Sequence, residues 1–151
     1  MWFRVFGTNG RQPEPAALLD HLQAHGFTVS GRFRGDDQGW FEVELWFGPD
    51  APLLLSCYRA EEEGLRAELN TWAAWLETVE DNPHHGPLMR HVIGTTQLFA
   101  LELPADHPQV GPLYLACVAL CRYLARETAG VYQADGEGFA NADGELLLRE
   151  D

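Results

Sequence analysis

Short runs in which apolar and polar residues alternate, separated by turns rich in glycine, proline and aspartate, fill much of the chain. Such runs predict β-strands, because successive side chains of a strand point to opposite faces of a sheet. The predicted strands cover residues 2–6, 27–34, 40–47, 53–58, 95–103 and 131–134, with two short runs near 139 and at 146–148. Asp-Gly steps between the last three runs are typical of hairpin turns, so we expect a mainly antiparallel sheet.

Between the strands, apolar residues recur every three or four positions, which predicts amphipathic helices. These cover residues 14–25, the stripe 65–79, a short segment 87–93, and 109–128. The last helix is apolar nearly all round, which indicates burial on more than one side or a place at a subunit contact. Basic residues at the ends of the first and last helices suit the negative end of a helix dipole; they are His21, His25, Arg122 and Arg126.

We therefore predict a single α+β domain over residues 1–151, with the element order β-α-β-β-β-α-β-α-β-β. Its sheet should be mainly antiparallel, with three main helices packed on one face. The two ends of the chain share a plan of strand, helix, glycine, strand, acidic turn and strand, which suggests a duplicated βαββ unit.

The composition is strongly acidic, with 23 Asp and Glu residues against 10 basic residues and a net charge of −13. Such a charge repels phosphate backbones and anionic membrane surfaces and attracts basic proteins, so we expect no nucleic-acid or membrane partner. Every basic residue is arginine. The lack of lysine excludes Schiff-base chemistry and a Walker lysine, and the sequence holds no nucleophile elbow or glycine-rich phosphate loop. We expect no catalytic activity and no cofactor.

The N-terminal residues lack the basic region and long apolar stretch of a signal peptide, and no window is apolar enough to span a membrane. We therefore expect a cytoplasmic protein. Three cysteines, at positions 57, 117 and 121, form no C-x-x-C motif, and we expect them to be buried and reduced.

The strand 40–47 carries the main candidate site. Strict alternation places one set of residues together on the solvent side, namely Trp40, Glu42, Glu44 and Trp46. The opposite set supplies the core, namely Phe41, Val43, Leu45 and Phe47. Tryptophan is frequent at interface hot spots and attracts cationic side chains, so a mixed aromatic and acidic strand face favours binding of a basic protein. In a simpler interpretation, helices or a partner subunit cover the Trp rings. We predict a non-enzymatic binding or regulatory protein, of the immunity or adaptor kind.

An alternative hypothesis rests on a histidine cluster. His84, His85 and His91 lie close to Asp81, and imidazoles with a carboxylate can hold zinc or iron in a small metal-binding protein or metal-dependent enzyme. Their spacing matches no recognised ligand pattern, and a solvated loop explains them as well. A third hypothesis is a homo-oligomer with the last helix at the subunit contact.

Overall fold

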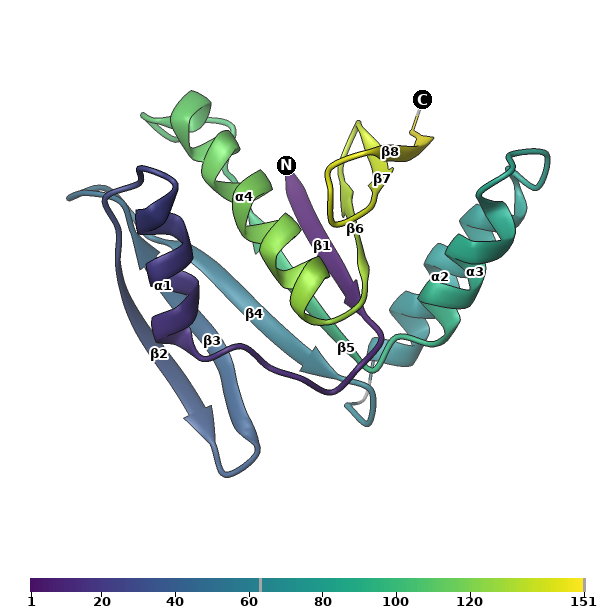
Figure 1. Cartoon of the computed structure of the whole chain (residues 1–151), viewed down its shortest axis with the longest axis horizontal. Coiled ribbons are helices and arrows are strands. Elements are labelled where there is room, and N and C mark those ends of the chain that lie inside the picture. Colours follow the sequence, from purple (N-terminus) through teal and green to yellow (C-terminus); the bar gives the residue numbers. More distant parts are fainter. Residues whose placement is uncertain (63, 151) are drawn as a thin grey trace.

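The computed structural model describes residues 1–62 and 64–150, and these form a single sheet with helices on both of its faces (Figure 1). The strands are β1 (Trp2–Gly7), β2 (Ser30–Asp36), β3 (Gly39–Trp46), β4 (Leu53–Arg59), β5 (Gln97–Glu102), β6 (Val131–Ala134), β7 (Gly138–Ala140) and β8 (Leu146–Arg149). The helices are α1 (Pro15–Ala24), α2 (Leu65–Glu77), α3 (His85–Ile93) and α4 (Val110–Glu127).

The sheet has eight strands in the order β2-β3-β4-β5-β1-β6-β7-β8, and every neighbouring pair is antiparallel. Hairpins join β2 to β3 and β6 to β7 at the acidic, glycine-containing turns that the sequence indicates. The predicted α+β class and the antiparallel sheet are thus confirmed, with α3 as a fourth helix in place of a short turn.

The sequence pattern predicts that the helices pack on one face of the sheet, and this prediction is wrong. Helices α1 and α4 pack on one face, and α2 and α3 pack on the other. In the central strand β1, Val5 faces a core formed with α1 and α4, while its neighbour Phe6 faces a second core formed with α2 and α3. In β5, Phe99 and Leu98 divide in the same way. Because α1 and α4 already cover one face, the apolar stripe of α2 can be buried only against the other face.

The two ends of the chain share the order β-α-β-β-β, and α1 and α4 lie on the same face of the sheet. Their paths differ. After α1 the chain runs to the sheet edge at β2 and returns inward to β4, whereas after α4 it enters beside β1 and runs outward to β8 (Figure 1). The similarity seen in the sequence is therefore one of element order and not of spatial arrangement.

All three cysteines are buried in the core beneath α1 and α4, as predicted. Burial raises the pKa of the Cys57 thiol to about 11 and that of Cys117 to about 12, so both are protonated thiols at neutral pH. In the described part of the chain, no helix combines the length and apolarity needed to cross a bilayer.

One edge and one helix leave unusual surface exposed. Strand β2 forms the edge of the sheet and is solvent-exposed along its whole length, with Phe33 60% exposed between Arg32 and Arg34. Most apolar residues of α4 face the core, but Leu115 on its outer side is 62% exposed. The predicted subunit contact through this helix stays a prediction.

Candidate functional site

Helices α2 and α3 cover only part of their side of the sheet. Their core takes residues from β1, β5, β6, β7 and β8 and none from the described residues of β2, β3 or β4. The strand register extends the uncovered surface in two rows. One row is Arg34, Glu42, Ser56, Ala100 and Arg4, and the other is Arg32, Glu44, Leu54, Glu102 and Trp2. Trp46 lies two residues beyond Glu44 along β3, and Tyr58 lies two residues beyond Ser56 along β4. We call the two rows together with Trp46 and Tyr58 the open face.

The open face combines large exposed side chains with charge. Trp2, Leu54 and Tyr58 are 40%, 46% and 42% exposed, and they come from β1 and β4. Glu102 of β5 lies between β4 and β1 and pairs with Trp2, and Glu44 of β3 lies opposite Leu54 on the outer side of β4. Scattered apolar residues are ordinary on a protein surface, but a contiguous group framed by charge is typical of an interaction surface.

Trp40 does not belong to this face, and the predicted four-residue stripe is wrong at this position. The β2–β3 register jumps from Arg34 opposite Glu42 to Gly35 opposite Trp40, which leaves Phe41 as the extra residue of a bulge. A bulge reverses the side to which the preceding residue points. Trp40 is therefore only 4% exposed, and its indole N–H donates to the Pro13 carbonyl at 2.7 Å.

The other three predicted residues, Glu42, Glu44 and Trp46, do share the open face and are each partly exposed. Glu42 accepts a hydrogen bond from Nε of Arg34 at 3.1 Å, and the indole N–H of Trp46 donates to Glu44 at 3.2 Å. The stripe is thus shorter than predicted and is partly neutralised by an arginine of the edge strand.

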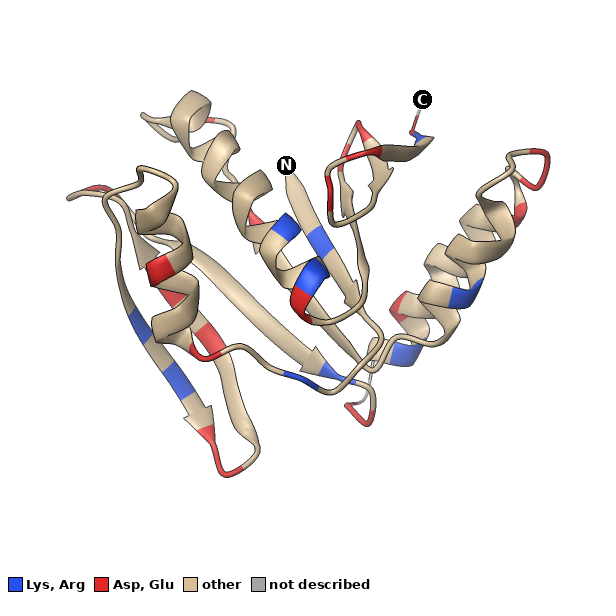
Figure 2. Ribbon diagram, in the orientation of Figure 1, with Lys and Arg blue, Asp and Glu red and all other residues tan. Residues whose placement is uncertain are grey.

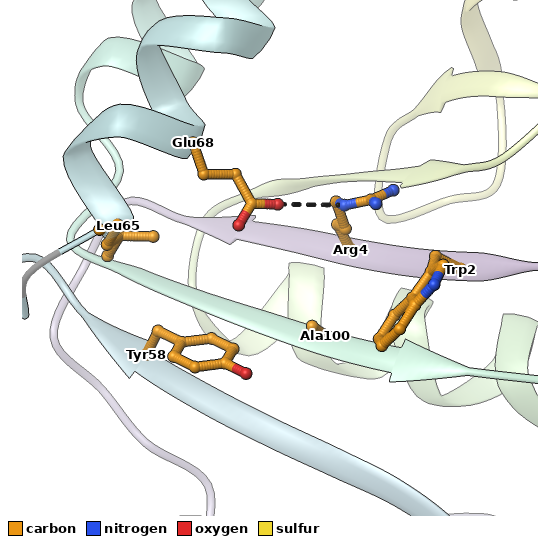
Figure 3. Close-up of a pocket in the computed structure, with 7 residues that line it drawn as sticks. Trp2, Arg4, Tyr58, Leu65, Glu68 and Ala100 are labelled. Carbon is orange, nitrogen blue, oxygen red and sulfur yellow. Dashed lines mark hydrogen bonds and ion pairs between the residues drawn. The ribbon is translucent and has the colours of Figure 1, made fainter.

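A cavity of about 340 Å³ lies where the open face meets the first turn of α2 (Figure 3). Ala100 forms its floor, and the rings of Trp2 and Tyr58 lie on either side of this small residue. Glu68 of α2 and Arg4 of β1 close the far side and pair with each other at 3.3 Å. The cavity therefore has two aromatic walls and an ion pair on its far side.

Arg4 is held by partners from helix α2, from strand β6 and from the turn after β6. It donates to Gln133 at 2.8 Å and to Asp135 at 2.9 Å, and its guanidinium lies 5.1 Å from the centre of the Trp72 ring. Burial alone would raise the pKa of Asp135. Hydrogen bonds from Gln133, Arg4 and the Trp2 backbone N–H outweigh this effect and lower the pKa below its ordinary value. The network therefore holds Arg4 at the end of the open face.

The predicted histidine cluster does not converge. His84 and His91 both line a cavity of about 520 Å³ formed by α3, the end of α4 and the loop after β7, but His85 does not. Within residues 1–62 and 64–150, no three His, Cys, Asp or Glu side chains are placed to hold a metal ion. The geometry thus gives no support to the metal hypothesis built on His84, His85, His91 and Asp81.

No family model, curated protein or solved structure matches the chain. The site is therefore assigned from its own geometry. Sequence reasoning missed Trp2, Leu54 and Tyr58, which are large hydrophobic side chains exposed on this face. The signal for Leu54 is hidden because it stands between Leu53 and Leu55 in an unbroken apolar run, where alternation cannot be seen.

Proposed function

We propose that this protein is a non-enzymatic binding or regulatory protein that docks a basic segment of another protein on its open face. The observation that supports this proposal is the uncovered sheet surface carrying Trp2, Leu54 and Tyr58 beside Glu44 and Glu102. Large aromatic and aliphatic side chains supply the binding energy of such surfaces, and surrounding charges select the partner.

The charge of the face favours a basic partner. Two of its three arginines, Arg4 and Arg34, are already ion-paired with carboxylates, so they offer little to an acidic ligand. The rings of Trp2 and Tyr58 form a suitable receptor for an arginine or lysine side chain through cation–π contacts. The net charge of −13 would also accelerate the approach of a basic protein.

The shape favours a polypeptide over a small molecule. Five strands spaced by roughly 4.8 Å make the face about 20 Å wide, which is the scale of a protein segment and not of a metabolite. A cytoplasmic location agrees with the three buried, unpaired cysteines.

The test is comparative capture from the native lysate with the double variant Glu44→Arg/Glu102→Arg. Glu44 lies opposite Leu54, and Glu102 follows Leu101, the partner of Leu55, so continuing the register by one residue places Glu102 on the other side of Leu54. We expect one or more basic proteins bound by the wild type to be lost, because the variant places like charge against the partner. Quantitative mass spectrometry of the eluates measures this loss.

The matched control is Glu77→Arg/Glu80→Arg, which makes the same change in net charge at exposed positions at the far end of α2. It should retain the captured proteins. Identical partner sets for the wild type and the open-face variant would sink the proposal, provided that circular dichroism shows both to be folded. Equal losses of captured proteins in the two variants would show that net charge alone causes the loss, and this result would also contradict the proposal.

A further inference from the structure

A groove of about 260 Å³ runs between α1 and α4 on the side of these helices that faces away from the sheet. Leu115 and Val118 of α4 form its apolar part, and Leu115 is 62% exposed. Arg122 and Arg126 continue the same side of α4, each about one helical turn further on, while α1 contributes His21 and His25. The groove therefore has an apolar end and a cationic end.

The two arginines carry charge that the protein does not neutralise. Their hydrogen bonds go to the backbone carbonyl of Ala142, at 3.3 Å from Arg122 and 3.5 Å from Arg126. Neither forms an ion pair with any carboxylate in the described part of the chain. Figure 2 shows basic segments on α4 toward its C-terminal end, among many acidic segments elsewhere. In so acidic a protein, two adjacent unpaired cations are a local reversal of sign.

His21 lies beside His25 and close to Arg126 in this groove. Burial lowers the pKa of His21, and the neighbouring His25 and Arg126 lower it further. The two imidazole rings lie 4.2 Å apart, and Tyr123 of α4 lies 4.4 Å from His21. Of the described residues, no Asp or Glu lines the groove. A carboxylate arriving there would meet cations and imidazoles without a competing acid.

We propose that the groove between α1 and α4 docks an acidic amphipathic helix of a partner protein. The cavity accommodates side chains and not a folded element, so the partner helix would lie across α1 and α4. Its apolar residues would pack on Leu115 and Val118, and its carboxylates would pair with Arg122 and Arg126. This site lies on the opposite side of the sheet from the open face and carries the opposite charge, so the two can be occupied together.

The probe is a fluorescein-labelled peptide of eighteen residues with leucines along one helical face, glutamates beside them and alanine elsewhere. Its counterpart has glutamine at every glutamate. Fluorescence anisotropy at low ionic strength measures binding of each peptide to the full-length protein. We expect the acidic peptide to bind at least about tenfold more tightly than its neutral counterpart, because charge-assisted hydrogen bonds form only with the former.

Two variants test the cationic end and the apolar end of the groove separately. Arg122→Gln/Arg126→Gln removes the cations and should weaken the acidic peptide by about tenfold or more. Leu115→Gln leaves the charge unchanged and should weaken both peptides about fivefold by removing an apolar anchor. The control is Arg66→Gln/Arg149→Gln, which removes two exposed arginines elsewhere and should leave binding within about twofold of the wild type.

Three outcomes would overturn the proposal. The first is wild-type protein that binds the acidic peptide no better than the neutral one. The second is an equal loss in the two double-arginine variants, which would assign binding to net charge. The third is a peptide that inorganic phosphate displaces fully and that Leu115→Gln does not weaken. These two results together would indicate a site that binds anions in general. Thermal melts of each variant identify any loss that comes from unfolding.

Discussion

Strands β3, β4 and β5 present two surfaces of very different character. On the side of α1 and α4, Val43, Leu55 and Phe99 are buried with at most 1% exposure and form part of the larger core. On the other side, neighbouring positions of the same strands carry Glu42, Leu54 and other residues of the open face.

The two sides of these strands therefore differ in how much they contribute to the stability of the fold. The covered side removes apolar area from water, which stabilises the fold at roughly 25 cal/mol per Å². The open side keeps aromatic and aliphatic groups in contact with water, where they contribute little to folding and where the proposed partner would bind. Substitutions on the two sides should therefore affect different measurements.

The sharpest comparison is between adjacent leucines. Leu55→Ala on the covered side, where Leu55 is 1% exposed, should lower the free energy of unfolding by about 3 kcal/mol through a new cavity. Leu54→Ala on the open side, where Leu54 is 46% exposed, should cost less than about 1 kcal/mol. Urea denaturation followed by circular dichroism measures both. Similar losses at the two positions would contradict the division of the sheet into a covered and an open side.

The two tryptophans at the ends of β3 provide a second comparison. Trp40→Ala should cost about 3–5 kcal/mol, because it removes a buried ring packed at 5.7 Å from Phe99 and leaves the Pro13 carbonyl without its donor. Trp46→Ala should cost about 1 kcal/mol, because this ring is only partly buried. The midpoints of urea unfolding report the contrast. A larger loss from Trp46→Ala would show that the bulge at Phe41 is placed wrongly.

Arg4 joins the open face to the covering helix α2. Its removal should change the free energy of unfolding less than the substitutions of the buried Leu55 and Trp40. Arg4→Met should lower the free energy of unfolding by about 1–2 kcal/mol, since Glu68 and Asp135 lose a partner but are each about 40% exposed and remain solvated. An exposed arginine on α2 supplies the control, Arg66→Met, which should change stability by less than about 0.5 kcal/mol.

The same variant has a pH signature. The pKa of Asp135 is lowered in the folded protein, so ionised Asp135 stabilises the fold. This contribution to the free energy of unfolding is complete above the ordinary pKa of 3.8 and is lost as the pH falls through the lowered folded value. Arg4→Met removes one cause of that lowering. The variant should therefore lose less stability than the wild type as the pH falls below about 4, as measured by urea midpoints at successive pH values. Parallel profiles would show that Arg4 does not influence Asp135.

The sequence predicts the elements well because most of them depend on local pattern. The stripe from Leu65 to Val79 and the hairpin turn after Ala134 need no information from elsewhere in the chain. The face on which α2 packs cannot be predicted in this way. A helix stripe demands an apolar surface but does not say which one, and β6 is buried on both sides, so its alternation disappears.

The candidate site shows the same limit. Glu42, Glu44 and Trp46 follow from alternation, but Trp40 does not, because a single extra residue at Phe41 shifts the register of the strand. The network around Arg4 brings together residues 64 to 131 positions apart, and no local pattern announces it. The helix dipole already explains why Arg122 and Arg126 stand near the end of a helix. The sequence therefore gives no sign that they share a groove with His21 and His25.

Strand β2 has a consequence for how the protein behaves at high concentration. Its backbone is unpaired on the outer side, and Phe33 stands 60% exposed in the middle, which is the pattern that invites strands of separate molecules to join into growing sheets. Two copies meeting antiparallel about Phe33 would bring Arg32 of each against Arg34 of the other. Like charges at opposed positions disfavour the pairing of two such edges, to the extent that Arg34 is not neutralised by Glu42 of its own chain.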